Sequence, residues 1–118
     1  FESVSFGEKL RIYADPHGRQ GLYYPTEYGE IDILALDGND NYVVIELKRD
    51  KAADKTVNQI GRYMQWVEEN LASKNSKSVR GIIIAHRGNQ SLLGSIKALR
   101  FPVAVKTYKL KIDLTDID

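Results

Sequence analysis

Three charged residues on two neighbouring apolar stretches have types and spacing that could support chemistry. Asp32 interrupts the stretch 29–36, and Glu46 and Lys48 end the stretch 42–49. A carboxylate in an apolar strand must be protonated, paired or bound to a cation, because desolvating the isolated charge is costly. Two opposed acids also repel each other, and a hard divalent cation such as Mg²⁺ removes that repulsion. The pattern therefore points to a metal site.

The two stretches are expected to form a β-hairpin that positions these charges. Both are rich in branched aliphatic residues, and a Gly-Asn-Asp-Asn turn at 38–41 joins them. If Leu36 faces Tyr42, antiparallel pairing places Asp32 opposite Glu46. The acids of the two strands would then meet on one face of the sheet.

Side-chain alternation along the strands adds further members to each face. Glu46 and Lys48 are two residues apart and share a face, and the same register places Glu30 opposite Lys48. The apolar side chains expected on the opposite face are Ile31, Ile33, Val43, Ile45 and Leu47.

This cluster has the parts that metal-assisted phosphodiester hydrolysis needs: a Lewis acid, an activated water and a cation for the developing phosphorane charge. The acid pair would hold the metal, and Lys48 would act on the water or on the charge. A structural alternative stays open. Glu46 and Lys48 could form a half-exposed ion pair of little energetic value, with Asp32 at a bend or paired to a nearby arginine.

The ordered motifs resemble those of a known nuclease group. Asp32 followed by Glu46-Leu47-Lys48 resembles the signature of the PD-(D/E)XK nuclease superfamily, and Gln59 with Tyr63 resembles the Gln-x-x-x-Tyr element of its RecB-like members. The string from about 25 to 86 is similar to the catalytic domain of the NucS/EndoMS endonucleases and their single-domain relatives. The proline that gives the signature its first letter is missing before Asp32.

The resemblance implies an α/β fold, a restriction-endonuclease-like mixed β-sheet flanked by helices. It also implies a divalent-metal-dependent endonuclease that hydrolyses DNA phosphodiester bonds with Mg²⁺ or Mn²⁺. The implied metal ligands are Asp32, Glu46 and the peptide carbonyl of Leu47. The implied catalytic residues are Asp32, Glu46, Lys48, Gln59 and Tyr63, of which Lys48 is the catalytic lysine and the last two line the cleft.

The third acid and the first helix of the family have no clear match here. Glu30 lies on the face of Asp32 and could be a third ligand or pair with Lys48. The chain starts at Phe1 without methionine, so we expect it to lack the family's first helix. That helix often bears an accessory glutamate, for which Glu2 is a poor substitute. We expect one nuclease-like domain over 1–118.

Charge placement is more informative than the net charge of +1, which does not by itself indicate a nucleic-acid-binding protein. Basic side chains follow the acid pair and recur on the later elements. They are Arg49, Lys51, Lys55, Arg62, Arg80 and Arg87. We expect Arg49, Lys51 and Arg62 to contact DNA phosphates, with an affinity that falls as salt rises.

Composition excludes several other classes. The 118 residues contain no cysteine, which excludes disulfides and thiolate metal sites and fits a reducing, cytoplasmic setting. His17 and His86 are too few and too far apart for a zinc site. No apolar run is long enough to span a membrane, so we expect no membrane partner. The partner that the resemblance implies is DNA.

The remaining elements follow the hairpin in a helix, strand, helix, strand order. Asp54 is the predicted N-cap of a helix that ends at about Ala72, with Gln59 and Tyr63 on the flank of its apolar stripe and Gly61 close to a strand. Apolar patterning predicts the other elements. They are a strand at 79–85, a helix at 91–99, a strand at 103–105 and an alternating edge strand at 108–114, which could pair with its own copy in a homodimer.

Two other functions remain open from the sequence. The domain could be a non-catalytic module that uses the same fold to bind nucleic acid or another protein. It could also be a junction-resolving or RNA-cleaving nuclease, because the hairpin does not encode the shape of the substrate.

Overall fold

A mixed β-sheet with two helices forms the body of the protein. The structure is a computed structural model, and it describes residues 6–49, 52–86, 90–108 and 112–117. The strands are β1 (Arg11–Ile12), β2 (Leu22–Thr26), β3 (Gly29–Leu36), β4 (Tyr42–Leu47), β5 (Val79–Ala85) and β6 (Val103–Thr107). The helices are α1 (Ala53–Val67), which continues as a π-helical segment (Glu68–Ala72) and a 3₁₀ segment (Ser73–Asn75), and α2 (Gln90–Ser95), which continues as a 3₁₀ segment (Ile96–Ala98).

The sheet has the strand order β1-β3-β4-β5-β6, and β2 pairs with the other end of β3. β3 runs antiparallel to β1, β2 and β4, whereas β4, β5 and β6 are parallel to one another. Parallel neighbours need a crossover connection, and α1 and α2 supply the two crossovers. The predicted mixed sheet and its order of meander, helix, strand, helix and strand are confirmed.

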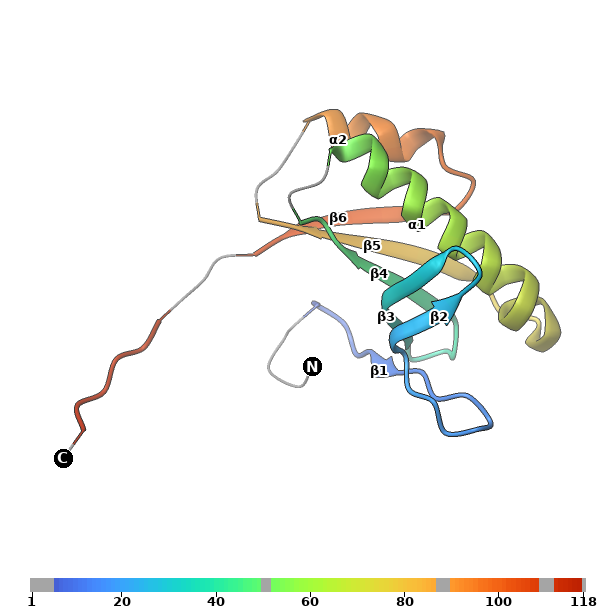
Figure 1. The fold of residues 1–118 in the computed structure, drawn as a ribbon, viewed down its shortest axis with the longest axis horizontal. Helices are drawn as coiled ribbons and strands as arrows, with labels where there is room; N and C mark the ends of the chain where they lie inside the picture. Colours follow the sequence, from blue (N-terminus) through green and yellow to red (C-terminus); the bar gives the residue numbers. More distant parts are fainter. Residues whose placement is uncertain (1–5, 50–51, 87–89, 109–111, 118) are drawn as a thin grey trace.

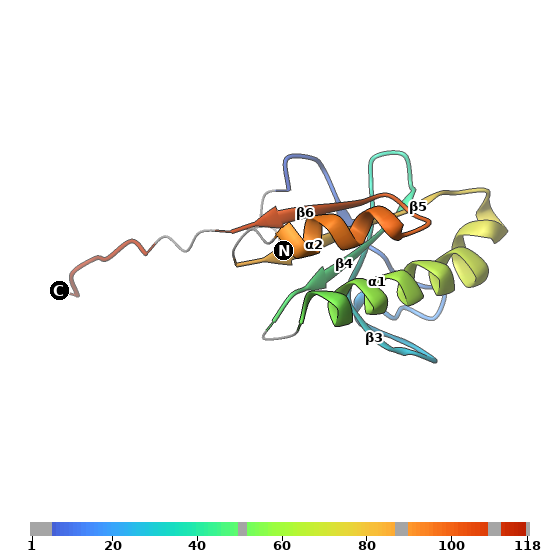
Figure 2. The same cartoon turned by 90° about the horizontal axis from the view of Figure 1, so that it is seen from above.

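Both helices cover the same face of the sheet (Figures 1 and 2). The buried stripe of α1, which includes Ile60 and Met64, packs on β4 and β5. Gly81 permits this close packing, because a Cβ atom there would lie 2.9 Å from Ile60 Cδ1 and 2.9 Å from Met64 Sδ. The close approach that we expected at Gly61 is made instead by Leu99, whose Cδ2 would lie 3.1 Å from the added Cβ.

The opposite face of the sheet, here called the open face, has a smaller apolar cluster. Its buried members are Phe6, Ala35, Val43, Ile45 and Ile82, and Leu10, Ile33 and Ile84 pack against them. Within the described ranges no helix covers this face, and the N-terminal segment supplies its cover. The helices therefore flank the sheet on one side.

The predicted register of the central hairpin is confirmed, since Leu36 pairs with Tyr42 and Ile33 pairs with Ile45. The predicted face of Ile31 is wrong: this side chain packs in the helix-side cluster with Tyr24. Beyond Ile33, which pairs with both β2 and β4, strand β3 pairs with β2 alone, and there Ile31 lies opposite Tyr24 of the helix-side cluster.

The predicted helix after the hairpin is present, but its first residue differs. Ala52 rather than Asp54 is the N-cap, and it makes no side-chain capping bond. The Asp54 carboxylate lies one residue inside the helix and accepts a hydrogen bond from the Lys55 amide at 3.0 Å. The predicted end at Ala72 is correct once the π-helical segment is included.

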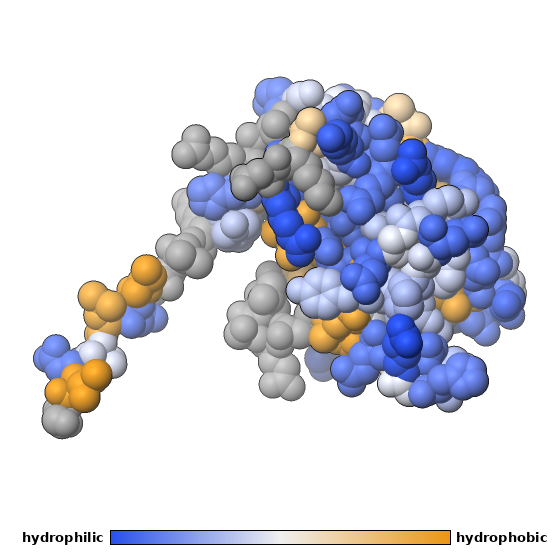
Figure 3. Space-filling view, in the orientation of Figure 1, coloured by the Kyte–Doolittle hydropathy of each residue, from blue (hydrophilic) through white to orange (hydrophobic). Residues whose placement is uncertain are grey.

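The edge strand predicted at 108–114 is wrong where the structure describes it. Strand β6 ends at Thr107, and neither Tyr108 nor the stretch 112–114 belongs to a strand; residues 109–111 lie outside the described ranges. The segment 112–117 extends away from the body, and it stands out as apolar surface in Figure 3. Its apolar residues are exposed at 70% (Ile112), 88% (Leu114) and 99% (Ile117).

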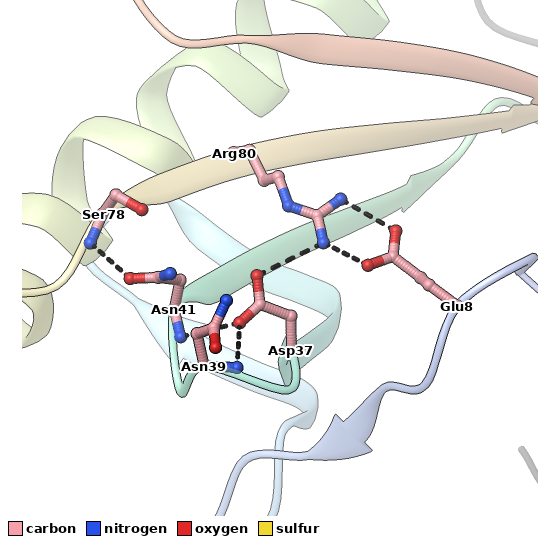
Figure 4. Close-up of polar contacts among 6 residues, drawn as sticks. All are labelled: Glu8, Asp37, Asn39, Asn41, Ser78 and Arg80. Atoms are coloured by element: carbon pink, nitrogen blue, oxygen red, sulfur yellow. Dashed lines mark hydrogen bonds and ion pairs between the residues drawn. The ribbon is translucent and has the colours of Figure 1, made fainter.

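Arg80 holds the N-terminal segment and the β3–β4 turn together (Figure 4). Its guanidinium donates to the Glu8 carboxylate at 3.0 and 2.5 Å and lies 3.4 Å from Asp37. The Asp37 carboxylate in turn accepts the amides of Asn39 and Asn41 at 2.9 and 3.0 Å. Arg80 lies near the start of β5, away from the Glu46 end of β4, so it does not lie beside the acid pair.

No helix in the described ranges has the length and apolar character needed to cross a membrane.

Candidate metal and catalytic site

Two carboxylates meet where the β3–β4 ladder ends. The last paired residues are Ile33 and Ile45. At the next position the Asp32 amide donates to Glu46 Oε1 at 3.1 Å, and the Leu47 amide donates to Asp32 Oδ2 at 2.9 Å. The side chains thus take the place of backbone acceptors, and both are buried, at 8% and 1% exposure. The predicted meeting of these two acids is present.

Helix α1 adds a tyrosine and an amide to the same space. Gln59 Nε2 donates to the Tyr63 hydroxyl at 2.8 Å. Burial raises the pKa of Tyr63, the hydrogen bond from Gln59 lowers it, and the negative charges of Glu46, Asp32 and Glu30 raise it further. Tyr63 is only 1% exposed, so its expected position on the flank of the helix stripe is wrong, and its ring belongs to the core.

The first residue of β3 must be glycine for Tyr63 to fit. Gly29 has φ +122°, a conformation that other residues rarely adopt. A Cβ atom at Gly29 would also lie 2.7 Å from the Tyr63 hydroxyl oxygen. The hydroxyl therefore lies directly against the backbone of the strand that carries Asp32.

Thr56 is a buried polar residue on α1 that the sequence analysis did not select. It is 1% exposed, and its hydroxyl has no hydrogen-bond partner within the described part of the chain. Thr56, Gln59 and Tyr63 recur at steps of three and four residues, so they lie along one side of α1. That spacing is the signal that could have identified Thr56.

The cations near the acids are placed differently from one another. Arg49 Nη2 lies 3.6 Å from Asp32 Oδ1, and the arginine side chain is 53% exposed. The Lys48 amide donates to the Ile84 carbonyl at 2.8 Å, which continues the pairing of β4 with β5. Lys48 is one of the residues that line a largely apolar hollow of about 590 Å³ on the open face, together with Phe6 and Ile84.

The other charged residues predicted near the site do not form ion pairs with the two acids in the described part of the chain. Among the described residues, no ion pair joins Lys48 to Asp32, Glu46 or Glu30. Glu30 is exposed and has Pro25 of β2 as its register partner. Arg62 is exposed on α1, and Lys51 lies outside the described residues.

The donor set fits a hard divalent cation. Mg²⁺ and Mn²⁺ prefer oxygen ligands, and Mg²⁺ keeps several waters while it takes one or two carboxylates. Asp32, Glu46 and the nearby peptide carbonyl of Leu47 would supply such ligands. No cluster of three or more acidic, histidine or cysteine side chains suited to a metal occurs in the part that the structure describes.

Comparison with known proteins shows which family this chain resembles. The family described as the Endonuclease NucS C-terminal domain matches residues 20–100. The chain is 34% identical over 76 residues to Endonuclease NucS of Sulfolobus acidocaldarius, covering 64% of this chain and 28% of that protein. It is 42% identical over 59 residues to Endonuclease NucS of Pyrococcus horikoshii, covering 50% of this chain and 22% of that protein.

Two structures share the fold. A crystal structure of a repair endonuclease from Pyrococcus abyssi aligns with a TM-score of 0.64 and 24% identity, covering 86% of this chain and 39% of the other. A structure of an EndoMS-dsDNA2 complex aligns with a TM-score of 0.55 and 20% identity, covering 88% of this chain and 38% of the other. The chain spans less than two fifths of the length of each relative named here. The family match covers more than half of the chain, so this protein belongs to the Endonuclease NucS C-terminal domain family.

Proposed function

We propose that this chain is the catalytic domain of a divalent-metal-dependent endonuclease that hydrolyses DNA phosphodiester bonds. The observation that carries the proposal is the interlocking of two buried carboxylates, in which the Asp32 amide binds Glu46 and the Leu47 amide binds Asp32. Amide donors fix both side chains in position. Two fixed, buried and adjacent negative charges favour the binding of a cation.

In this proposal Asp32, Glu46 and the Leu47 carbonyl hold Mg²⁺ or Mn²⁺. When bound, the ion supplies a Lewis acid that lowers the pKa of a bound water and neutralises charge on the phosphate.

The neighbouring residues have supporting roles. Lys48 would stabilise the negative charge that develops on the phosphate, once its ammonium turns toward the acid pair. The Tyr63 hydroxyl accepts from Gln59, which leaves its proton available to donate to a water or to a phosphate oxygen. Because burial and the nearby acids raise the pKa of Tyr63, the hydroxyl keeps this proton at neutral pH.

The test combines calorimetry of Mn²⁺ binding with cleavage of plasmid and branched DNA in Mg²⁺, Mn²⁺ or EDTA. Wild type is compared with Asp32→Asn and Glu46→Gln, which keep the size of the side chains but remove the charge. Asp37→Asn is the matched control, because Asp37 lies just beyond the other end of β3 with Arg80 as its partner. We expect Mn²⁺ binding and cleavage to be lost in the first two variants and retained in the control.

A second pair of variants tests the catalytic lysine. Lys48→Met should abolish cleavage and leave Mn²⁺ binding intact. Lys77→Met is its control, since the Lys77 ammonium donates to the Asn39 carbonyl at 3.0 Å in the turn at the other end of β3. Wild type that binds no Mn²⁺, or cleavage that survives Asp32→Asn, would contradict the proposal.

A non-catalytic DNA-binding module is the second candidate, and one observation favours it. Arg49 lies 3.6 Å from Asp32 Oδ1 and partly neutralises this acid without a metal. Salt-sensitive DNA binding that is unaffected by EDTA, by Asp32→Asn and by Lys48→Met, with no cleavage, would support the module. Inclusion of RNA and of four-way junctions in the same assay separates the DNA endonuclease from an RNA-cleaving or junction-resolving enzyme.

A further inference from the structure

A groove runs along α1 beside the β2–β3 turn, which Figure 1 shows against the middle of the helix. It consists of two hollows of about 620 and 320 Å³ that share Tyr28, Asn58 and Arg62. Each volume lies in the range of roughly 300–1,000 Å³ that is usual for small-ligand sites. Gln59 and Tyr63 line the smaller hollow, so the groove shares these two residues with the candidate site.

Tyr28 presents an aromatic ring to this groove from a firmly held turn. Its side chain is 51% exposed. The turn is closed by pairing of Thr26 with Gly29, by a hydrogen bond from the Thr26 hydroxyl to the Gly29 carbonyl at 2.8 Å, and by one from the Tyr28 amide to Thr26 Oγ1 at 3.0 Å. An exposed ring on a rigid support loses little conformational freedom when it stacks on a ligand.

The charge of the groove is positive. Lys55, Arg62 and Arg100 line it, and neither hollow has an aspartate or glutamate in its wall. Arg100 is already paired with Glu68 at 2.7 Å and lies 5.0 Å from the centre of the Phe101 ring. Lys55 and Arg62 form no ion pair with any other described residue, which leaves their charges to bind an anion.

We propose that this groove, here called the Tyr28 groove, binds one unstacked nucleotide of the DNA strand beside the bond that is cleaved. The base packs on the Tyr28 ring, and the adjoining phosphates contact Arg62 and Lys55. The inference rests on the proposed endonuclease function, because Gln59 and Tyr63 belong both to the smaller hollow and to the candidate site. An unpaired base fits better than a duplex, since stacking on a protruding ring requires a base whose face is free.

The proposal is tested by the metal-free binding of a short single-stranded oligodeoxynucleotide that contains one 2-aminopurine, with EDTA present to prevent cleavage. Stacking on an aromatic ring quenches 2-aminopurine fluorescence, and anisotropy gives the affinity. Tyr28→Ala should lose the quenching and weaken binding by between about 5-fold and 150-fold, the usual range for one base stacked on an aromatic side chain. Tyr28→Phe should retain both.

Two further variants provide controls. Tyr23→Ala removes another exposed aromatic ring, 60% exposed on β2 but outside the groove, and should bind like wild type. Arg62→Gln should reduce the slope of log affinity against log salt by about 0.7, the value for one phosphate contact to a single strand. A circular dichroism melt of each variant shows whether it is folded.

The result that overturns the Tyr28 groove is wild-type affinity in Tyr28→Ala, or an equal loss in Tyr28→Phe and Tyr28→Ala. Absence of any oligonucleotide binding by wild type overturns it as well. Failure of the endonuclease proposal is a separate result, because it would show as absence of metal-dependent cleavage while the metal-free binding assay still decides whether Tyr28 stacks on a base.

Discussion

Gly29→Ala should dislodge the Tyr63 hydroxyl and thereby damage the candidate site from the strand side. The native φ of +122° at Gly29 is unfavourable for alanine. The new methyl group would also lie 2.7 Å from the hydroxyl oxygen, well inside van der Waals contact. Tyr63 is 1% exposed and its ring belongs to the core, so moving the hydroxyl away from the methyl group requires the core packing to shift.

The two effects give a magnitude. A residue held in a sparsely populated backbone region costs about 1–3 kcal/mol. Displacement of the hydroxyl breaks the hydrogen bond from Gln59, which adds about 1 kcal/mol. The free energy of unfolding should therefore fall by about 2–4 kcal/mol. At about 4 °C for each kcal/mol in a domain of this size, the midpoint of thermal unfolding should fall by about 8–16 °C.

The assay is urea unfolding of a double-mutant cycle. Tyr63→Phe removes the hydroxyl that the methyl group would meet, so Gly29→Ala should cost about 1 kcal/mol less in that background than in wild type. Gly38→Ala is the matched control and should be nearly neutral, because a Cβ atom there has no neighbour within 4 Å. An equal loss in both backgrounds would refute the contact between Tyr63 and β3.

Two other substitutions test the packing and the charge of the fold. Gly81→Ala should destabilise the protein by about 1–3 kcal/mol through overpacking, because the added Cβ would lie 2.9 Å from both Ile60 Cδ1 and Met64 Sδ; a neutral effect in urea unfolding would show that α1 can shift. Burial raises the pKa of Asp37. Hydrogen bonds from the Asn41 and Asn39 amides and from the Arg80 guanidinium lower this pKa by more, so it lies below 3.8. A carboxyl group whose pKa is lower in the folded than in the unfolded state stabilises the fold at a pH above its unfolded-state pKa. This stabilisation is lost as the pH falls through its folded-state pKa. Asp37→Asn should therefore be less stable at neutral pH and show a weaker decline of stability below about pH 4; a decline as steep as that of wild type would contradict this.

The central hairpin could be predicted because its information is local. Two apolar runs and the turn at 38–41 determine the strands, and pairing of Leu36 with Tyr42 follows from the turn. The change of partner strand at Ile33 could not be predicted from these runs. It depends on β2, a short edge strand that contains Pro25 and therefore lacks a typical strand pattern.

The site could be predicted in part for a similar reason. Strand alternation and register bring Asp32 and Glu46 together, and both positions lie within or beside a regular ladder. Lys48 follows the last residue of β4, where side-chain direction depends on which surfaces are nearby, and the open face offers it an apolar wall. The burial of Tyr63 depends on how closely α1 approaches β3, and only the tertiary contact with Gly29 reveals it.

The acid pair and the tyrosine belong to parts of the fold that need not open together. Asp32 and Glu46 are 14 residues apart within one hairpin, and amides of that hairpin hold both side chains. Tyr63 joins them only when α1 docks on the sheet. A fluctuation that lifts α1 off the sheet would thus expose the two carboxylates to water while they stay adjacent. The acid pair would therefore remain assembled in a partly unfolded state in which the helix is undocked.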